Sequence, residues 1–115
     1  LSKEGQIELS KNLQIATATI DGLGLCLFVA FAVLDTEDAV QCMCDLVAAT
    51  HGIEFTADDF IALGVNTLKD ELEFNRKAGF TKSDDQLPRF FSEEKLEPHN
   101  TVWEYTVEEL QAAKV

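Results

Sequence analysis

The sequence is short of basic residues and has no apolar run long enough to cross a membrane. Nine lysines and arginines stand against 21 acidic residues, which gives a formal net charge of -12. A surface of this sign repels the phosphate backbone of nucleic acids and the head groups of anionic membranes, so we expect neither as a partner. The longest apolar run extends from Leu23 to Leu34, well short of the roughly 18 to 20 residues that a membrane span needs. It is therefore expected to be a buried core segment.

Cysteine and proline are also scarce. The three cysteines are odd in number and show no disulfide-framework spacing, which is typical of a reducing compartment. No basic segment with a small-residue cleavage site precedes the apolar run, so nothing indicates export and we expect a cytoplasmic protein. The hydrophobic and charged fractions, 46% and 26%, are those of an ordinary globular domain. The chain begins at Leu1 without an initiator methionine, which suggests a fragment.

Hydrophobic periodicity predicts an all-α fold with about five helices, because apolar residues recur at helical spacing and no stretch alternates as a strand would. The first helix is expected from Ser2 to the Asp21-Gly22 stop, and the second within the apolar run. The third is expected between an Asp35-Thr36 cap and Gly52, and the fourth from Thr56 to about Ala78. The last helix is expected after Thr106. Capping boxes at Thr56–Asp59 and Thr106–Glu109 mark two of the starts.

Three of the expected helices have a recognisable apolar face. The faces are Leu9, Leu13, Ala16 and Ile20 in the first helix, Val40, Met43 and Val47 in the third, and Ile61, Val65, Leu68 and Leu72 in the fourth. Residues 80–100 show no periodicity and contain both prolines, so we expect a long ordered loop there. The apolar side chains expected to pin this loop are Phe80, Leu87, Phe90 and Phe91.

Cys42 and Cys44 are the first candidates for metal ligands. On a helix, positions two apart point about 200° apart around the axis, so the two thiols cannot bind one ion. Cysteine is often buried, and we interpret both as core residues. His51 and His99 have no cysteine or carboxylate at a zinc-ligand spacing, which favours structural roles for both. The sequence also has no glycine-rich phosphate loop, Ser/His/Asp order or HExxH helix.

The stretch DGLGLC, residues 21–26, places an acid, two glycines and a cysteine at the start of the apolar run. From the residues alone it is a helix break, in which the acid caps, the glycines turn and the cysteine packs. A second stretch, FNRKAGFTKSDDQLPRFF, occupies residues 74–91. Together the two stretches resemble the C-terminal part of the aldehyde ferredoxin oxidoreductase family of tungsten-pterin enzymes. The family's D-x-x-G-L-C motif is matched by Asp21, Gly24, Leu25 and Cys26. Its F-N…G-F helix end is matched by Phe74, Asn75, Arg76, Gly79 and Phe80. Its D-D-x-L-P segment is matched by Asp84, Asp85, Leu87 and Pro88.

The resemblance implies that residues of the first stretch bind cofactors. Asp21 would accept two N–H bonds from the edge of a tungstopterin, because one carboxylate can form such a charge-assisted pair. Gly22 and Gly24 would let the backbone approach the flat ring closely, and Leu25 would add main-chain contacts. Cys26 would ligate a 4Fe-4S cluster through its thiolate. One short loop would then hold both redox centres.

The same resemblance implies an oxidoreductase that converts aldehydes to carboxylic acids at tungsten held by two pterins, with electrons passed through the cluster to ferredoxin. The family's C-x-x-C-x-x-x-C run is absent from this sequence, as are its second pterin motif and its acid/base residues. Residues 1–115 are therefore expected to be a single C-terminal helical domain of a larger enzyme, inactive alone and with no catalytic residue of its own. Its partners would be the rest of its polypeptide, the aldehyde and ferredoxin, and a homodimer is left open.

Two other functions remain open from the sequence. An enzyme of the same superfamily with another substrate, such as an aromatic acyl-CoA reductase, would share these motifs, and the choice between tungsten and molybdenum on the molybdopterin is also open. A helical interaction module that has lost its cofactors would keep the fold. Such a module would have no reason to keep a carboxylate and a thiol at Asp21 and Cys26.

Overall fold

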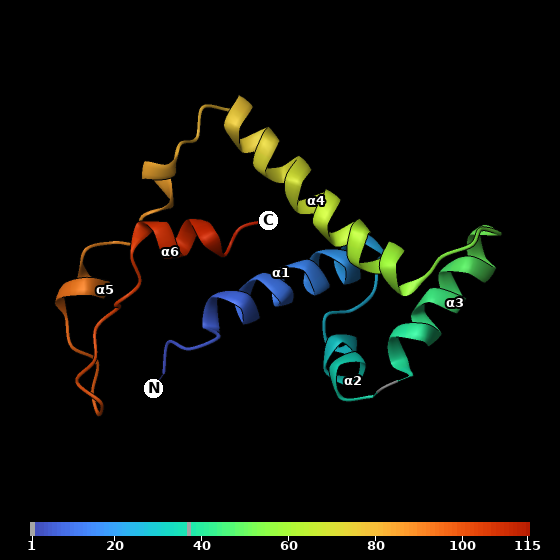
Figure 1. Ribbon diagram of the computed structural model, residues 1–115, viewed down its shortest axis with the longest axis horizontal. Coiled ribbons are helices and arrows are strands. Elements are labelled where there is room, and N and C mark those ends of the chain that lie inside the picture. The colour runs from blue at the N-terminus through green and yellow to red at the C-terminus, as the bar shows by residue number, and fades with distance from the viewer. Residues whose placement is uncertain (1, 37) are drawn as a thin grey trace.

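The computed structural model describes residues 2–36 and 38–115 as six α-helices and one 3-10 turn (Figure 1). The helices are α1 (Gln6–Gly22), α2 (Val29–Asp35), α3 (Ala39–His51), α4 (Ala57–Lys77), α5 (Phe90–Glu93) and α6 (Val107–Ala112), and the 3-10 turn is η1 (Lys82–Asp85). Across these two ranges the β-structure is limited to an isolated bridge between Leu96 and Thr101, and no helix has both the length and the apolar character to span a bilayer. The predicted all-α class is confirmed, with α5 as an addition.

The predicted capping sequences form the caps that were expected of them. In the box before α4, the Thr56 N–H donates to the Asp59 carboxylate at 2.8 Å, and before α6 the Thr106 N–H donates to the Glu109 carboxylate at 2.7 Å. These reciprocal bonds satisfy N–H groups that a helix start leaves without partners. At the end of α3, Gly52 takes a left-handed φ of 64°, as a helix-stopping glycine does.

Two helix starts differ from the prediction. α1 begins at Gln6 and not at Ser2, because the preceding glycine has a φ of 73° that ends the helical backbone there. α3 begins after Asp38 and not at an Asp35-Thr36 cap, because Asp35 still belongs to α2. Gly5 has no side chain that could cap α1, and the Asp38 side chain makes no cap hydrogen bond to α3, so these starts have no strong local signal.

α1 and α4 form the main contact between helices, and they cross at very short range (Figure 1). The crossing is centred on the buried Gly64. A Cβ at this position would collide with the backbone oxygen of Ile15 and lie 2.5 Å from Oγ1 of Thr19. Thr19 is itself fully buried, and its hydroxyl donates to the Phe60 carbonyl at 2.8 Å. Glycine is required here because the two backbones touch with no side chain between them.

The hydrophobic core is small and lies next to this crossing. Its buried members come from three helices and are Ile20 of α1, Met43 and Cys44 of α3, and Phe60 of α4. Partly buried apolar side chains pack around them, namely Leu23, Leu25, Ala30, Val33, Val40 and Phe55. The core thus joins the C-terminal end of α1 to the N-terminal end of α4 and to α3.

The buried faces of α1 and α4 agree with the predicted ones only in part. Ile20 is buried, and Val65, Leu68 and Leu72 are half-buried, as expected. Leu9 and Leu13 of α1 are exposed, and so is Ile61 of α4, whereas Phe60 and Gly64 are buried instead. The prediction followed the large apolar residues, but a close crossing places the smallest residue at its centre. Since glycine carries no hydrophobic signal, periodicity could not locate the face that it defines.

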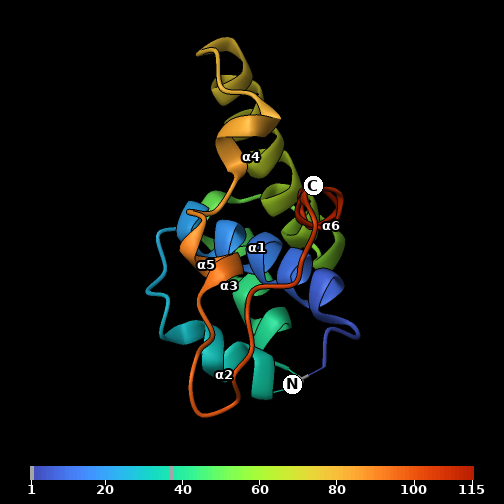
Figure 2. The same cartoon turned by 90° about the vertical axis from the view of Figure 1, so that its left-hand side faces the viewer.

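The expectation of a helix buried on all sides over 23–34 is wrong. The first part of this run is a loop, α2 begins only at Val29, and Phe28 is 80% exposed, with Leu27 and Phe31 also exposed. Figures 1 and 2 both show α2 at the edge of the molecule, away from the C-terminal end of α4. One side of the run packs on the core, and the other has no cover from the described residues.

The predicted loop 80–100 contains η1 and α5, and its expected apolar anchors do not hold it. The side chains of Phe80, Leu87, Phe90 and Phe91 are each at least 37% exposed, so the prediction that they pin the segment is wrong for the described residues. Phe90 and Phe91 stack on one another with ring centroids 4.3 Å apart. A backbone hydrogen bond from Trp103 N–H to the Phe91 carbonyl, 2.7 Å long, ties the segment to the chain beyond it.

Polar contacts join the C-terminal residues to η1 and to α1. Asp85 of η1 accepts hydrogen bonds from Gln111, at 3.1 Å, and from Lys114. The Gln14 amide of α1 donates to the Ala113 carbonyl at 3.1 Å. The hydrogen bond from Lys114, reinforced by the one from Gln111, holds the pKa of Asp85 below its ordinary value. α6 is thereby placed between η1 and α1.

Replacing Gly64 by alanine should force α1 and α4 apart. The added Cβ would collide with a backbone oxygen of α1, which no rotamer change can relieve, so we expect a loss of roughly 1 to 3 kcal/mol in the free energy of unfolding. Asn66→Ala is the matched control, because Asn66 is exposed on the same helix, and it should be neutral or slightly stabilising. Chemical unfolding of both variants is the measurement, and equal stabilities would contradict the close crossing.

The contacts of Asp85 should make stability depend on pH. Because the folded pKa of Asp85 is lowered, its ionised form stabilises the fold above the unfolded-state pKa of about 4. That contribution is lost as the pH falls through the folded pKa. Asp85→Asn should therefore be less stable than the unmodified protein near neutral pH, and the difference should close in acid.

Thermal unfolding from about pH 7 to about pH 3 measures this difference. Asp70→Asn is the control, since Asp70 is an exposed aspartate of α4, and its curve should follow that of the unmodified protein. A stability difference for Asp85→Asn that stays constant over the whole range would show that the ion pair contributes nothing.

Candidate functional site at the end of helix α1

The stretch 21–26 ends α1 in a Schellman motif. The Leu25 N–H donates to the Ile20 carbonyl at 3.0 Å, and the Gly24 N–H donates to the Asp21 carbonyl at 3.0 Å, which are the two bonds that define this motif. Gly24 has a φ of 73°, a left-handed conformation that glycine adopts at no steric cost. The Leu25 side chain packs against the core. The predicted helix break is confirmed at Gly24, and the core holds it in place. The expected packing of Cys26 is wrong, because this thiol is exposed. Asp21 and Gly22 still belong to α1.

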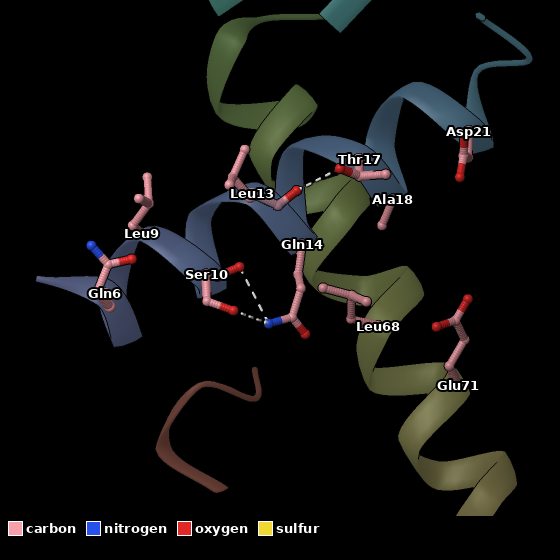
Figure 3. Close-up of a pocket in the computed structure, with 10 residues that line it drawn as sticks. All are labelled: Gln6, Leu9, Ser10, Leu13, Gln14, Thr17, Ala18, Asp21, Leu68 and Glu71. Atoms are coloured by element: carbon pink, nitrogen blue, oxygen red, sulfur yellow. Dashed lines mark hydrogen bonds between the residues drawn. The ribbon is translucent and has the colours of Figure 1, made fainter. Parts of the chain in front are cut away.

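Asp21 is exposed in the last turn of α1 and lines a groove of about 530 Å³ between α1 and α4 (Figure 3). The other lining residues are Gln6, Leu9, Ser10, Leu13, Gln14, Thr17, Ala18, Leu68 and Glu71. Figure 3 shows Asp21 and Glu71 at the end of the groove away from Gln6. Within the described ranges, the Asp21 carboxylate has no hydrogen-bond or ion-pair partner. It can therefore accept hydrogen bonds from the N–H groups of a ligand.

The two glycines of the stretch differ in what the fold requires of them. Gly24 is required by its left-handed backbone. Gly22 is the last residue of α1, and a Cβ at this position would meet no atom within 4 Å. Glycine in a helix is about 1 kcal/mol less favourable than alanine, and the described residues give no compensating reason for it at Gly22. The backbone there is open to close approach from outside the chain.

Cys26 lies in the loop between α1 and α2 as a free, exposed thiol. Its neighbours Gly24 and Leu25 already use their N–H groups in the cap, so their carbonyls are the main-chain groups that remain for a ligand. Gly22 and Leu25 also line a smaller cavity of about 180 Å³ against α3, which neither Asp21 nor Cys26 lines. The structure thus brings the carboxylate and the thiol onto one exposed turn, while part of the same turn faces α3.

The other two cysteines do not form a metal site. Cys44 is fully buried, as predicted, whereas Cys42 is exposed, so the core interpretation is wrong for Cys42. The two side chains point to different sides of α3, as their spacing requires. Burial, with a smaller effect of Asp45 and Asp59, raises the pKa of the Cys44 thiol. Residues 2–36 and 38–115 contain no group of three or more His, Cys, Asp or Glu that could hold a metal ion.

The second motif, residues 74–80, also ends a helix in a Schellman motif. The Phe80 N–H donates to the Asn75 carbonyl at 3.0 Å, and the Gly79 N–H donates to the Arg76 carbonyl at 3.2 Å. Gly79 has a φ of 95°. Gly24 and Gly79 are thus explained by the same backbone requirement at the end of a helix.

The two aspartates of the D-D-x-L-P segment have structural contacts that sequence reasoning missed. The Asp84 carboxylate accepts the Thr81 N–H at 2.7 Å and caps η1, while Asp85 holds the C-terminal residues. Sequence reasoning also missed Glu71, because its groove exists only where α4 crosses α1. A groove made by two helices far apart in the sequence leaves no local signal.

Comparison with known proteins shows which family the chain belongs to. Residues 1–113 match the family model described as aldehyde ferredoxin oxidoreductase, domains 2 & 3. A tungsten-containing aldehyde ferredoxin oxidoreductase of Pyrococcus furiosus is 37% identical over 94 residues, which are 81% of this chain and 15% of that protein. Proteins of the same name from Pyrococcus horikoshii and Thermococcus kodakarensis are 37% and 36% identical over 84 residues, which are 72% of this chain and 13% of each relative.

The chain therefore belongs to the aldehyde ferredoxin oxidoreductase family, as the resemblance of its motifs predicted. The matched segment makes up only 15% or 13% of the length of these curated relatives. Most of each relative thus has no counterpart in the sequence. No solved structure matches this chain.

Proposed function

We propose that residues 1–115 form the C-terminal cofactor-binding domain of a tungsten-pterin enzyme that oxidises aldehydes to carboxylic acids and delivers the electrons to ferredoxin. The observation that carries this proposal is the exposed turn 21–26, where a carboxylate without a described partner and a free thiol stand at the end of α1 in a chain of this family. The tungsten, the aldehyde and ferredoxin come from the names of the relatives.

Asp21 would bind the pterin through its two carboxylate oxygens. A pterin carries neighbouring N–H donors on one edge, and an ionised carboxylate accepts two such bonds as a charge-assisted pair. The exposure of Asp21 beside an open groove supports this role, since no described residue competes for its oxygens.

The backbone of the same turn would lie under the ring. The open space around Gly22 would let a flat group come closer than any side chain allows. Because the N–H groups of Gly24 and Leu25 are used in the cap, the contacts made by these two residues would come from their carbonyls. The ring would therefore have to offer N–H groups to the turn as well as to Asp21.

The donors of this chain fit one ligand of a 4Fe-4S cluster and not a complete site. Such a cluster is held by four thiolates, and the exposed thiols among the described residues are Cys26 and Cys42, which lie on different elements. Cys26 would supply one ligand, and the remainder of the polypeptide would supply the others. That remainder would also cover the exposed apolar side chains of Leu27, Phe28 and Phe31, because contiguous apolar patches mark interfaces.

When bound, the cofactors would supply the redox chemistry by which an aldehyde and water become a carboxylic acid, two protons and two electrons. The residues of this chain would hold and orient the cofactors, and none of them is assigned as the catalytic acid or base. Residues 1–115 would therefore act as a single C-terminal domain and would be inactive when separated from the rest of the enzyme.

Asp21→Asn in the complete enzyme should weaken the retention of pterin while the fold is kept. The amide places a donor where the pterin needs an acceptor and removes the charge, a change of about 1.5 to 3 kcal/mol. Glu71→Gln is the matched control, because it neutralises the other carboxylate of the same groove. Tungsten and pterin content after dialysis is the measurement, with the unfolding midpoint recorded beside it.

Gly22→Ala tests the proposed pterin-binding turn by adding a methyl group instead of removing a charge. No atom of the chain opposes the added methyl group, so the fold should be as stable or about 1 kcal/mol more stable, while the methyl group would block the ring. Full pterin content in both Asp21→Asn and Gly22→Ala would refute the roles proposed for this turn.

Cys26→Ala in the complete enzyme should leave the cluster short of one ligand. The iron content should fall, or the reduced enzyme should show the electron paramagnetic resonance spectrum of a three-iron cluster, because one of four thiolates is gone. Cys42→Ala is the matched control, since it removes another exposed thiol, and it should keep the full iron content. If Cys26→Ala keeps an unaltered 4Fe-4S spectrum and all its iron, Cys26 is not a ligand.

A further inference from the structure

The Thr19 side chain links α1 to α4 immediately before the turn 21–26. It is fully buried, and its hydroxyl lies 2.8 Å from the Phe60 carbonyl oxygen of α4 and 3.1 Å from the Ile15 carbonyl oxygen of its own helix. A hydrogen bond depends on direction as well as on distance. A buried hydroxyl that bonds across two helices therefore limits how far one can rotate or slide against the other.

Gly64 sets the distance between the same two helices. A Cβ there would collide with the Ile15 backbone oxygen and lie 2.5 Å from the Thr19 hydroxyl oxygen, so the helices are in contact through their backbones. The contact at Gly64 and the bond from Thr19 to Phe60 lie one helical turn apart on α4. These two neighbouring constraints fix the crossing more firmly than either would alone.

The crossing is connected directly to the candidate site. Ile20 follows Thr19, is 1% exposed in the core, and accepts the Leu25 N–H through its carbonyl at 3.0 Å. The turn therefore cannot move relative to α4 without loss of a buried contact or a backbone hydrogen bond. Asp21 also shares its groove with Leu68 of α4 (Figure 3), so the crossing sets the width of that groove.

From this geometry we infer that Thr19 and Gly64 are positioning residues for the site, which hold the Asp21 carboxylate and the Cys26 thiol in place relative to α4 without touching a ligand themselves. The inference rests on the proposed function, which assigns this turn to a pterin and a cluster. A displacement of about 1 Å at a positioned group can lower an enzymatic rate on the order of 100-fold. A small change at Thr19 should therefore be measurable at the site.

The test compares Thr19→Val, Thr19→Ser and Thr67→Val in the complete enzyme. Valine keeps the shape of threonine without its hydroxyl, whereas serine keeps the hydroxyl. Thr67 is the control, because it is partly buried on α4 and its hydroxyl donates at 2.9 Å to the Leu63 carbonyl of its own helix. The three measurements are the unfolding midpoint, the tungsten and pterin content after dialysis, and the hydrogen-exchange rates of the Gly24 and Leu25 amides.

In Thr19→Val, the amide hydrogens of Gly24 and Leu25 should exchange with solvent roughly tenfold faster, since their hydrogen bonds would open more often. This variant should also lose pterin on dialysis. Thr19→Ser should restore both properties, and Thr67→Val should change neither. A lower unfolding midpoint in Thr19→Val with unchanged exchange and full cofactor content would overturn the inference and leave the proposed function intact.

Two further results separate a failure of this inference from a failure of the proposed function. If Thr19→Val does not fold, Thr19→Ala replaces it in the same comparison with Thr19→Ser, and the same criteria apply. If the unmodified enzyme itself contains no tungsten or pterin, the proposed function fails and the inference fails with it. The exchange rates of the Gly24 and Leu25 amides would then still report whether the Thr19 bond holds the turn.

Discussion

The backbone contact of α1 and α4 at Gly64 is the constraint on which the rest of this structure depends. The buried core contains few side chains. The arrangement of the helices therefore depends strongly on this crossing and on the hydrogen bond that Thr19 makes beside it. α3 packs at the C-terminal end of α1, and the residue that ends α6 accepts a hydrogen bond from Gln14 in the middle of α1. Three other helices, α2, α3 and α6, contact one or both of these two.

Where a helix end has a local signal, the sequence predicted that end well, because the responsible contacts join residues that are close in the chain. The starts of α1 and α3 have no such signal, and both were predicted too early. The capping boxes at Thr56 and Thr106 and the stops at Gly52 and Gly79 are side-chain or backbone bonds across three to five positions. The buried faces were predicted less well. They depend on which helix is the partner, and at Gly64 the deciding residue has no side chain to count.

In the candidate site, too, local features could be predicted from the sequence, whereas the contact between helices could not. The glycines of residues 21–26 predicted a turn, and the resemblance of the motif indicated what the turn would bind. The groove beside Asp21 could not be predicted, because two of its lining residues come from α4. The exposed side chains of Leu27 and Phe28 show a further limit. An apolar run indicates that some surface will cover it but does not say whether that surface belongs to the same segment of chain.

Asp21 occupies an electrostatically unfavourable place. It stands in the last turn of α1, where the helix dipole concentrates partial negative charge and a carboxylate is unfavourable by about 0.3 to 1 kcal/mol. Glu71 adds a second acid at the same end of the groove. In the proposed site, a ligand that donates hydrogen bonds to Asp21 would relieve this repulsion as it binds. By linkage it would stabilise the folded domain, so the residue that recognises the ligand would also make the domain depend on it for stability.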